Sequence, residues 1–151
     1  QQRYQEAEAL FNRALTGRKL KLGEDHPYTL ETINDLGLLR REQQRYEEAE
    51  NLLTEALEGR KTKLGSGHPH TFETVHALGL LYVAQEDYDK AEPLLLAAYN
   101  GRETKLGPEH PDTIDSLREL VRLYEAWNKP DEAENWRARV PWVEDAEEPF
   151  R

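Results

Sequence analysis

Residues 64–71 read Leu-Gly-Ser-Gly-His-Pro-His-Thr, and the same frame occurs as Leu-Gly-Glu-Asp-His-Pro-Tyr-Thr at 22–29 and as Leu-Gly-Pro-Glu-His-Pro-Asp-Thr at 106–113. Successive copies are 42 residues apart. Self-similarity at a fixed period of this length is typical of proteins built from stacked structural repeats. The cluster of histidines is therefore one copy of a repeated marker, and it sets the register of the whole chain.

A second marker recurs with the same period. Tyr4-Gln-Glu-Ala-Glu, Tyr46-Glu-Glu-Ala-Glu and Tyr88-Asp-Lys-Ala-Glu are again 42 residues apart, and Pro130-Asp-Glu-Ala-Glu is a weaker fourth copy. Between the two markers, apolar residues recur three or four positions apart, which is the spacing of one face of an α-helix. Each unit therefore contains two helices.

The ends of these helices are marked by glycine and proline. A glycine after the last apolar residue ends a helix with a positive φ, and a proline suits the first turn of the next helix. The marker residues are Gly23, Gly65 and Gly107, and Pro27, Pro69 and Pro111. They place helices at 3–22, 27–43, 46–64, 69–85, 88–106, 111–127 and 130–140. Seven antiparallel helices with short turns predict an all-α fold, an α-solenoid of helix pairs.

Within each pair, a small residue stands at a fixed distance from an alanine. Leu36-Gly37 lies twelve residues before Ala49, and Leu78-Gly79 lies twelve before Ala91. This pattern resembles the tetratricopeptide repeat (TPR), and the 42-residue unit with Leu-Gly-x-x-His-Pro-x-Thr resembles the kinesin light chain type. Arrays of that type are also attached to bacterial Ser/Thr kinases and switch ATPases. The resemblance covers nearly the whole chain, and it implies a right-handed superhelix and the C-terminal part of a larger bacterial signalling protein.

The repeats also predict how the chain is divided. We expect a helical repeat domain over 1–140, followed by an acidic, mostly disordered tail over 141–151. The domain consists of a half repeat at 3–22 and helix pairs at 27–64, 69–106 and 111–140.

Both ends of the array have expected features. Helix 3–22 is the second helix of a pair whose first helix is absent, which predicts a fragment of a longer array. Its apolar face lacks the expected partner at Ala7, Leu10, Phe11 and Ala14. At the other end, we expect Trp127 and Trp136 to cover the end of the core.

Composition excludes several classes of function. The chain has no cysteine, which excludes disulfides and thiolate metal sites. Its formal charge of −10 disfavours nucleic acid and anionic membrane surfaces, and RNA binding by a helical repeat is disfavoured for the same reason. No stretch approaches the length of a membrane span, and the N-terminus lacks the apolar core of a signal peptide. We expect a cytoplasmic protein without a membrane or nucleic-acid partner.

No group of residues predicts catalysis or metal binding. Stacked repeats separate His26, His68 and His110 by at least one helix packing distance, about 8–10 Å, so they do not converge on one ion. Glu73 and His76 have the Glu-x-x-His spacing of di-iron bundles, but the other repeats lack that pair. We therefore predict no enzyme, no cofactor and no metal. The histidines before the prolines are expected to be helix-start residues.

Glycine recurs inside the second helix of each pair. An interior glycine is less favourable than alanine by about 1 kcal/mol, so a recurrent one needs a reason. The reason is either a close approach of the neighbouring helix or a slight bend in a long helix. The positions are Gly17, Gly59 and Gly101, each followed by arginine.

The TPR resemblance implies a concave groove lined by the first helix of each pair. Carried over by position, its residues are Glu31, Asn34, Leu38 and Arg41, then Glu73, His76, Leu80 and Val83, and then Asp115, Arg118, Arg122 and Glu125. Helical spacing independently places the members of each set on one face. We interpret the chain as a protein-interaction module that binds a peptide or protein segment there.

Amides and arginines in this groove suit an extended backbone and a carboxylate, which predicts a partner with acidic character. Two alternatives remain open. One is that these residues are an ordinary solvated surface. The other is that the chain is a self-associating or structural scaffold segment, in which helix 3–22 docks on a second copy.

Overall fold

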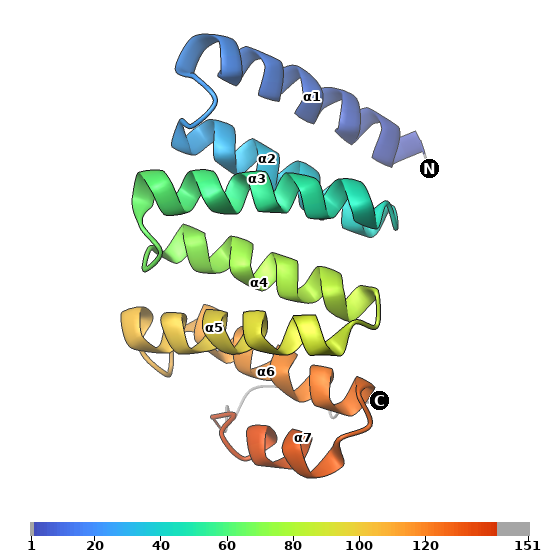
Figure 1. Cartoon of the computed structure of the whole chain (residues 1–151), viewed down its shortest axis with the longest axis vertical. Helices are drawn as coiled ribbons and strands as arrows, with labels where there is room; N and C mark the ends of the chain where they lie inside the picture. The colour runs from blue at the N-terminus through green and yellow to red at the C-terminus, as the bar shows by residue number, and fades with distance from the viewer. Residues whose placement is uncertain (1, 142–151) are drawn as a thin grey trace.

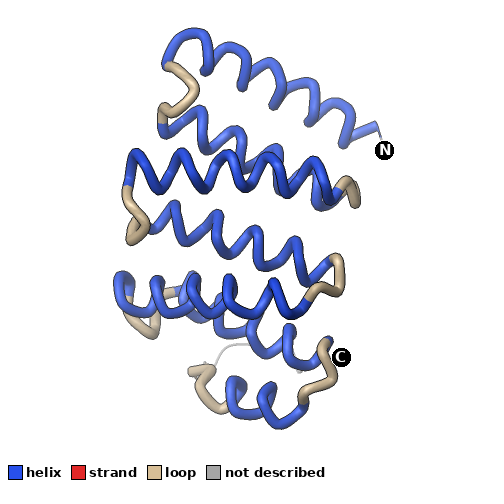
Figure 2. Tube along the Cα trace, viewed as in Figure 1, coloured by secondary structure: helices blue, strands red, loops and turns tan. Residues whose placement is uncertain are grey.

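The computed structural model describes residues 2–141, and side chains from Glu6 onward. It contains the helices α1 (Gln2–Leu22), α2 (Pro27–Glu42), α3 (Tyr46–Leu64), α4 (Pro69–Ala84), α5 (Tyr88–Leu106), α6 (Pro111–Ala126) and α7 (Pro130–Arg137). They stack from α1 at the top of Figure 1 to α7 at the bottom, and this part of the chain holds no strand (Figure 2). The predicted all-α solenoid is confirmed.

One expectation differs from the structure at the C-terminal end, and another lies outside the described residues. The last helix ends at Arg137 rather than at 140. The expected tail, including Trp142, lies outside the described residues beyond Pro141. Within the described helices, none has an apolar stretch long enough to cross a membrane.

The repeated histidines begin the first helices. The Nδ1 atom of each accepts a hydrogen bond from the backbone N–H two residues later, at 3.3 Å for His26 and 3.2 Å for His68 and His110. The preceding glycines have φ of 96°, 90° and 93°, as the sequence predicts. In two turns the repeated threonine closes the loop, because Thr29 and Thr71 each donate to the glycine carbonyl at 2.8 Å. The whole frame is thus a helix-to-helix connection.

The first helices end at a non-glycine residue with positive φ, which the sequence does not predict. Gln44, Glu86 and Asn128 follow them with φ near 60° although none is glycine. After α2, the backbone N–H of Arg45 donates to the carbonyl of Arg40 at 2.9 Å, which satisfies a carbonyl at the helix end. Each first helix is therefore one residue shorter than expected.

The core lies between the helices of each pair, where a leucine rests on a glycine. A Cβ atom built on Gly37 would lie 2.7 Å from Leu53 Cγ, and one on Gly79 would lie 2.7 Å from Leu95 Cγ. Both leucines are 0% exposed. Only glycine allows this approach, which explains the Leu-Gly element of the repeat.

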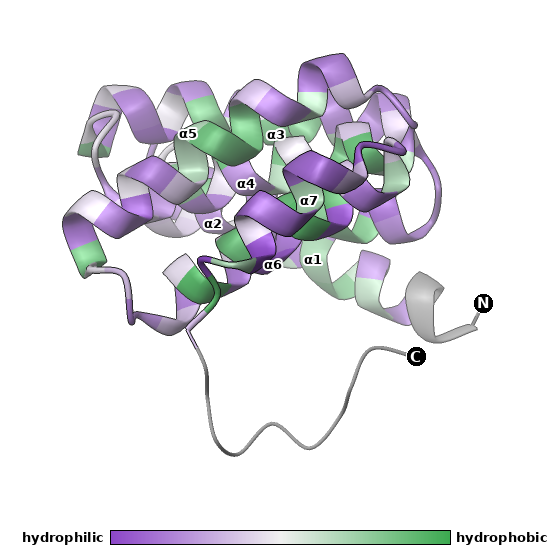
Figure 3. Ribbon diagram, turned by 90° about the horizontal axis from the view of Figure 1, so that it is seen from below, coloured by the Kyte–Doolittle hydropathy of each residue, from purple (hydrophilic) through white to green (hydrophobic). Residues whose placement is uncertain are grey.

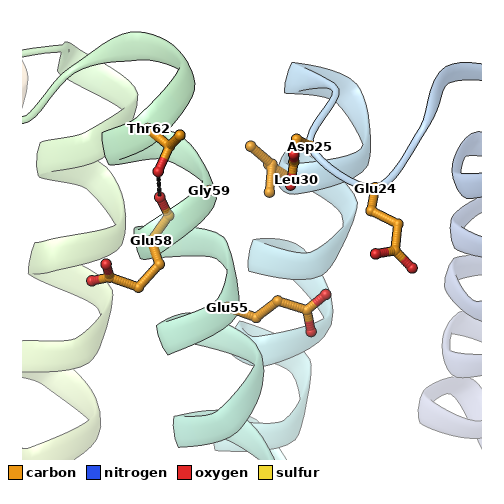
Figure 4. A pocket seen from close by; sticks show the side chains of 7 residues that line it. All are labelled: Glu24, Asp25, Leu30, Glu55, Glu58, Gly59 and Thr62. Carbon is orange, nitrogen blue, oxygen red and sulfur yellow. Dashed lines mark hydrogen bonds between the residues drawn. The ribbon is translucent and has the colours of Figure 1, made fainter.

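The interior glycines of the second helices accept a side chain from the first helix. A Cβ atom on Gly59 would overlap Leu30, and one on Gly101 would overlap Phe72. Figure 4 shows Leu30 and Gly59 on the facing helices α2 and α3. The close-approach explanation is therefore correct at these two positions, although a side chain rather than a backbone makes the approach.

An arginine joins each second helix to the next pair. Arg60 Nη1 on α3 donates to the carbonyl of His70 at 2.7 Å, to Thr74 Oγ1 at 2.7 Å and to Glu73 Oε2 at 3.0 Å, all on α4. Arg18 makes the equivalent bonds from α1 to α2, and Arg102 donates to Ser116 Oγ on α6 at 2.7 Å. We call these residues the clamp arginines.

Neighbouring pairs are also joined through a repeated glutamate. The Tyr82 hydroxyl donates to Glu50 Oε1 at 2.8 Å, and the Tyr124 hydroxyl donates to Glu92 Oε1 at 2.6 Å. In the first unit Arg40 replaces the tyrosine and binds Glu8 Oε1 at 2.8 Å. The departure from the repeat therefore keeps the contact and changes a hydrogen bond into an ion pair.

The C-terminal end of the core is closed by aromatic residues. Trp127 and Trp136 pack against the cluster formed by α5, α6 and α7, as predicted. Trp127 stacks on Tyr88 with ring centroids 5.8 Å apart, and Trp136 meets Tyr99 edge-on at 5.3 Å. Such pairs add stability beyond the area that they bury.

Candidate functional site

The predicted binding residues lie on α2, α4 and α6, the first helices of the three pairs. Figure 3 looks from the α7 end of the stack and places α3 and α5 on one side, with α2 and α6 on the other. Helix α2 contacts α4 directly. The face formed by α2, α4 and α6 is called the first-helix face below.

The twelve predicted residues differ in exposure. The exposed ones are Glu31, Glu73, Asp115, Arg122 and Glu125, and the half-buried ones are Leu38, Arg41, His76, Leu80, Val83 and Arg118. Asn34 is buried. The structure therefore brings eleven of the twelve to the surface to some extent, and one not at all.

Asn34 corrects the sequence interpretation. It is 1% exposed, and its Oδ1 accepts a hydrogen bond from Thr74 Oγ1 of α4 at 3.0 Å. The side chain therefore joins α2 to α4, and its carbonyl oxygen is not free for a partner. Helical spacing placed Asn34 on the correct side of α2, but it could not show that α4 covers that position.

His76 occupies the equivalent position on α4 and is mostly buried as well. Its Nε2 is buried, and no atom of the described residues hydrogen-bonds to it. Burial lowers the pKa of His76 to about 4, and the positive charges of Arg102 and Arg41 act in the same direction. The imidazole is therefore neutral at pH 7.

This histidine predicts a pH dependence of stability. Between about pH 6.5 and pH 4 the unfolded chain binds a proton that the folded His76 does not bind. The free energy of unfolding is therefore expected to fall by about 2–3 kcal/mol as the pH is lowered through this window. Urea unfolding followed by circular dichroism at several pH values measures it.

The control for this prediction is His76→Asn, which copies the residue that α2 has at this position. Asp35 has a pKa raised by burial and Glu8 has a pKa lowered by hydrogen bonds to Arg40 and Gln43, so both also change stability in acid. The difference between the two proteins isolates His76. An unchanged pH profile in the variant would contradict the prediction.

Each charged residue among the twelve predicted ones already has an oppositely charged neighbour. On α6, Arg118 lies 3.6 Å from Asp115, and Arg122 pairs with Glu119. On α2, Arg41 Nη2 lies 2.7 Å from Glu42. A partner's carboxylate would compete with these pairs, which are exposed and individually weak.

The acidic members are held by arginines of the second helices. Glu31 pairs with Arg18 at 3.3 Å and Glu73 with Arg60 at 3.0 Å, while Glu125 pairs with Arg137. Because Glu73 Oε2 is occupied by Arg60 and also lies 3.3 Å from His70, it does not form a metal-binding pair with His76. Among residues 6–141, no three metal-ligating side chains gather.

Apolar residues lie between the charged ones. Leu38 packs against the core of α3 and α4, while Leu80 and Val83 pack against the core of α5 and α6. All three are half-buried, so part of each side chain remains at the surface. The first-helix face therefore has apolar residues on α2 and α4, whereas its α6 end is charged.

One further hollow lies elsewhere, between the α1–α2 turn and α3. Its volume is about 360 Å³, and it is lined by Glu24, Asp25, Leu30, Glu55, Glu58, Gly59 and Thr62 (Figure 4). Three of its carboxylates are already paired with lysines, such as Glu55 with Lys19 at 3.2 Å. The 42-residue repeat does not predict this hollow, because three of its four acidic residues have no acidic counterpart in the other units.

Comparison with protein families matches residues 1–62 and 63–139 to the tetratricopeptide repeat. The chain belongs to the tetratricopeptide repeat family. The two matched segments together cover nearly the whole chain, so the TPR resemblance inferred from the Leu-Gly element is confirmed. TPR domains generally mediate protein–protein interaction or scaffolding. No curated protein matches the chain.

Two solved structures show the same TPR architecture. BtubC (BKLC) from P. vanneervenii has a TM-score of 0.82 at 21% identity, over 99% of this chain and 64% of that one. This identity supports the fold alone. A Podosopora anserina putative kinesin light chain with nearly identical TPR-like repeats has a TM-score of 0.80 at 27% identity, over 91% of this chain and 65% of that one. The chain thus spans just under two thirds of either protein, and its repeats are kinesin light chain-like.

Proposed function

We propose that this TPR domain is a non-enzymatic interaction module that binds an extended segment of a partner protein along the first-helix face. The observation that supports the proposal is that Leu38 on α2 and Leu80 and Val83 on α4 are half-buried apolar residues, whereas the equivalent positions on α6 are charged. Interfaces commonly combine an apolar centre with a polar rim. The partner segment would therefore contribute apolar side chains opposite α2 and α4 and charged ones opposite α6.

Arg118 and Arg122 would bind the charged end. Their side chains are 39% and 58% exposed, and guanidinium groups pair with carboxylates in a planar, two-bond geometry. Acidic character of the partner stays a prediction that rests on these two residues and Arg41. A cytoplasmic location and a larger bacterial signalling protein as host also stay predictions.

The chemistry of the described side chains supports binding rather than catalysis. His76 is neutral and half-buried, and its Nε2 atom is buried. The Ser116 hydroxyl accepts from Arg102 at 2.7 Å and donates to the Asp112 carbonyl at 3.0 Å, so no base is placed to activate it.

Site-specific crosslinking can identify the partner and its binding face together. A photoreactive amino acid replaces Arg122 on α6 or, as a matched control, Lys61 on α3. Both positions are exposed and pair with an acidic residue three positions earlier. We expect a protein crosslinked in cells through position 122 and not through position 61.

Binding measurements with the purified partner then test the contribution of Arg122 to affinity. Arg122→Ala is expected to weaken binding by about tenfold, or about 1.4 kcal/mol, while Lys61→Ala leaves the affinity unchanged. Unfolding curves of both variants should match the parent, because each residue makes only an exposed ion pair. Crosslinking through position 61 alone, or loss of affinity in Lys61→Ala alone, would place the binding site on the second helices instead.

A further inference from the structure

The N-terminal end of a first helix, called its turn end below, follows the turn from the preceding second helix. At the turn end of α4, Thr71 donates to the Gly65 carbonyl in the turn at 2.8 Å, and Thr74 donates to Asn34 on α2 at 3.0 Å. The third contact is the clamp arginine Arg60 of α3, whose acceptors on α4 include a carboxylate. The turn end of α4 is therefore fixed to its turn, to α2 and to α3.

Two of these contacts are absent at the turn end of α6. The equivalent threonine in its turn is Thr113, whose buried Oγ1 atom hydrogen-bonds to no described residue. The pair equivalent to the bond between α2 and α4 is His76 on α4 and Ser116 on α6. Ser116 donates to the Asp112 carbonyl of its own helix at 3.0 Å, and the buried Nε2 of His76 accepts from no described residue. Helices α4 and α6 also approach each other in fewer places than α2 and α4 do.

The third contact, the clamp, is weaker at α6. Arg102 of α5 donates to Ser116 Oγ at 2.7 Å and to the Asp112 carbonyl at 3.2 Å, which are both neutral acceptors. Asp115 stands where α4 has the glutamate of the clamp, and it pairs with Arg118 at 3.6 Å instead. Hydrogen bonds between two charged groups are stronger than those to a neutral acceptor. All three contacts at this turn end are therefore missing or reduced.

The other end of α6, called its far end below, is held firmly. The Tyr124 hydroxyl donates to Glu92 Oε1 on α5 at 2.6 Å, and Trp127 stacks on Tyr88 of α5 with ring centroids 5.8 Å apart. Helix α7 packs on α6 in the same core cluster, through Ala133. The last pair is thus joined to α5 strongly at one end and weakly at the other.

We propose that α6 and α7 swing as a unit on helices α2–α5, about a pivot at Tyr124 and Trp127. The turn end of α6 moves toward and away from α4, whereas the far end stays in place. Such rigid-body motion about a few residues is a common form of conformational change. It changes the width of the first-helix face between α4 and α6, and it leaves the width between α2 and α4 constant.

Distances between nitroxide labels, measured by electron paramagnetic resonance, test this hinge in the full chain. The chain has no cysteine, so introduced cysteines are labelled selectively. Cysteines replace His70 and Asp112 to span the turn ends of α4 and α6, or Tyr28 and His70 to span those of α2 and α4. A third pair replaces Ala84 and Ala126, at the far ends of α4 and α6. All five positions are exposed, and they are the second or the last residues of their helices.

The distance distribution of the 70/112 pair is expected to be about twofold broader than those of the 28/70 and 84/126 pairs. Equal widths for 28/70 and 70/112 overturn the proposal, because both turn ends are then equally fixed. An equally broad distribution for 84/126 also overturns it, because α6 then moves as a whole and has no pivot.

Exchanging the contacts between the two places tests their role. His76→Asn, Asp115→Glu and Ser116→Thr together give α6 the side chains found at the turn end of α4, and they are expected to narrow the 70/112 distribution to the width of 28/70. The reciprocal change, Asn34→His with Thr74→Ser, is expected to broaden 28/70. If the first variant folds and 70/112 stays broad, the missing contacts do not cause the swing and the proposal fails. The comparison of the three pairs in the parent chain decides the matter if a variant does not fold.

Discussion

Leu95→Ala is expected to lower the free energy of unfolding by about 2–5 kcal/mol, measured by urea unfolding. The side chain is fully buried between α4 and α5, and it rests against the bare backbone of Gly79. Removing it leaves a cavity that the rigid helices on both sides do not fill. The loss of the buried methyl groups and the cavity both contribute to the decrease.

A double variant tests whether the glycine and the leucine act as a pair. Gly79→Ala alone is expected to destabilise the chain, because its Cβ atom would lie 2.7 Å from Leu95 Cγ. In Gly79→Ala/Leu95→Ala the new methyl group enters the cavity, so the combined loss is smaller than the sum of the single losses. Phe11→Ala, at the equivalent but half-buried position, serves as the control and should destabilise less. Additive losses would contradict the paired arrangement.

Arg60→Met is expected to lower the free energy of unfolding by about 3–5 kcal/mol, since two hydrogen bonds from a charged donor contribute about 1.5–3 kcal/mol each. The clamp arginine Arg60 has a side chain only 4% exposed, and it donates to Thr74 and to the His70 carbonyl. Methionine keeps most of the apolar contact of the side chain and removes the donors. Denaturant unfolding again measures the change.

Arg18→Met is the matched control for this prediction. Arg18 makes the equivalent set of hydrogen bonds, to Tyr28, Glu31 and Thr32, but its side chain is 39% exposed. Water can replace the lost donor there, so the expected decrease is below about 1 kcal/mol. Equal losses in Arg18→Met and Arg60→Met would show that burial of the clamp does not determine its strength.

The repeat markers predict most of the fold because they act locally. A positive-φ glycine, a capping histidine and a proline define each helix start without help from distant residues. Their 42-residue period then orders the helices along the stack. The left-handed conformations of Gln44 and Glu86 are not predictable from these residue types, which have no preference for positive φ, and only Asn128 is of a type enriched there.

The candidate site was less predictable, because it depends on how neighbouring pairs meet. Helical spacing places Asn34 on the first-helix side, but Asn34 is buried where it bonds to Thr74 of the next pair, which the spacing does not describe. The role of Arg40, which stands where later repeats have tyrosine, also depends on a neighbouring unit. Its hydrogen-bond acceptor, Glu8, lies on another helix. A residue's role in a solenoid is therefore partly set by the unit that stacks on it.

The Thr74 hydroxyl has a consequence for any sequence that lies along α2 and α4. Its oxygen accepts a hydrogen bond from Arg60 on α3, and its proton is donated to Asn34 on α2. It therefore links the neighbouring first helices α2 and α4 directly. Helices in contact are about 8–10 Å apart, and an extended chain advances about 3.3 Å per residue. The step from α2 to α4 therefore corresponds to about three residues of a bound strand, which predicts that two partner residues contacting α2 and α4 are about three positions apart.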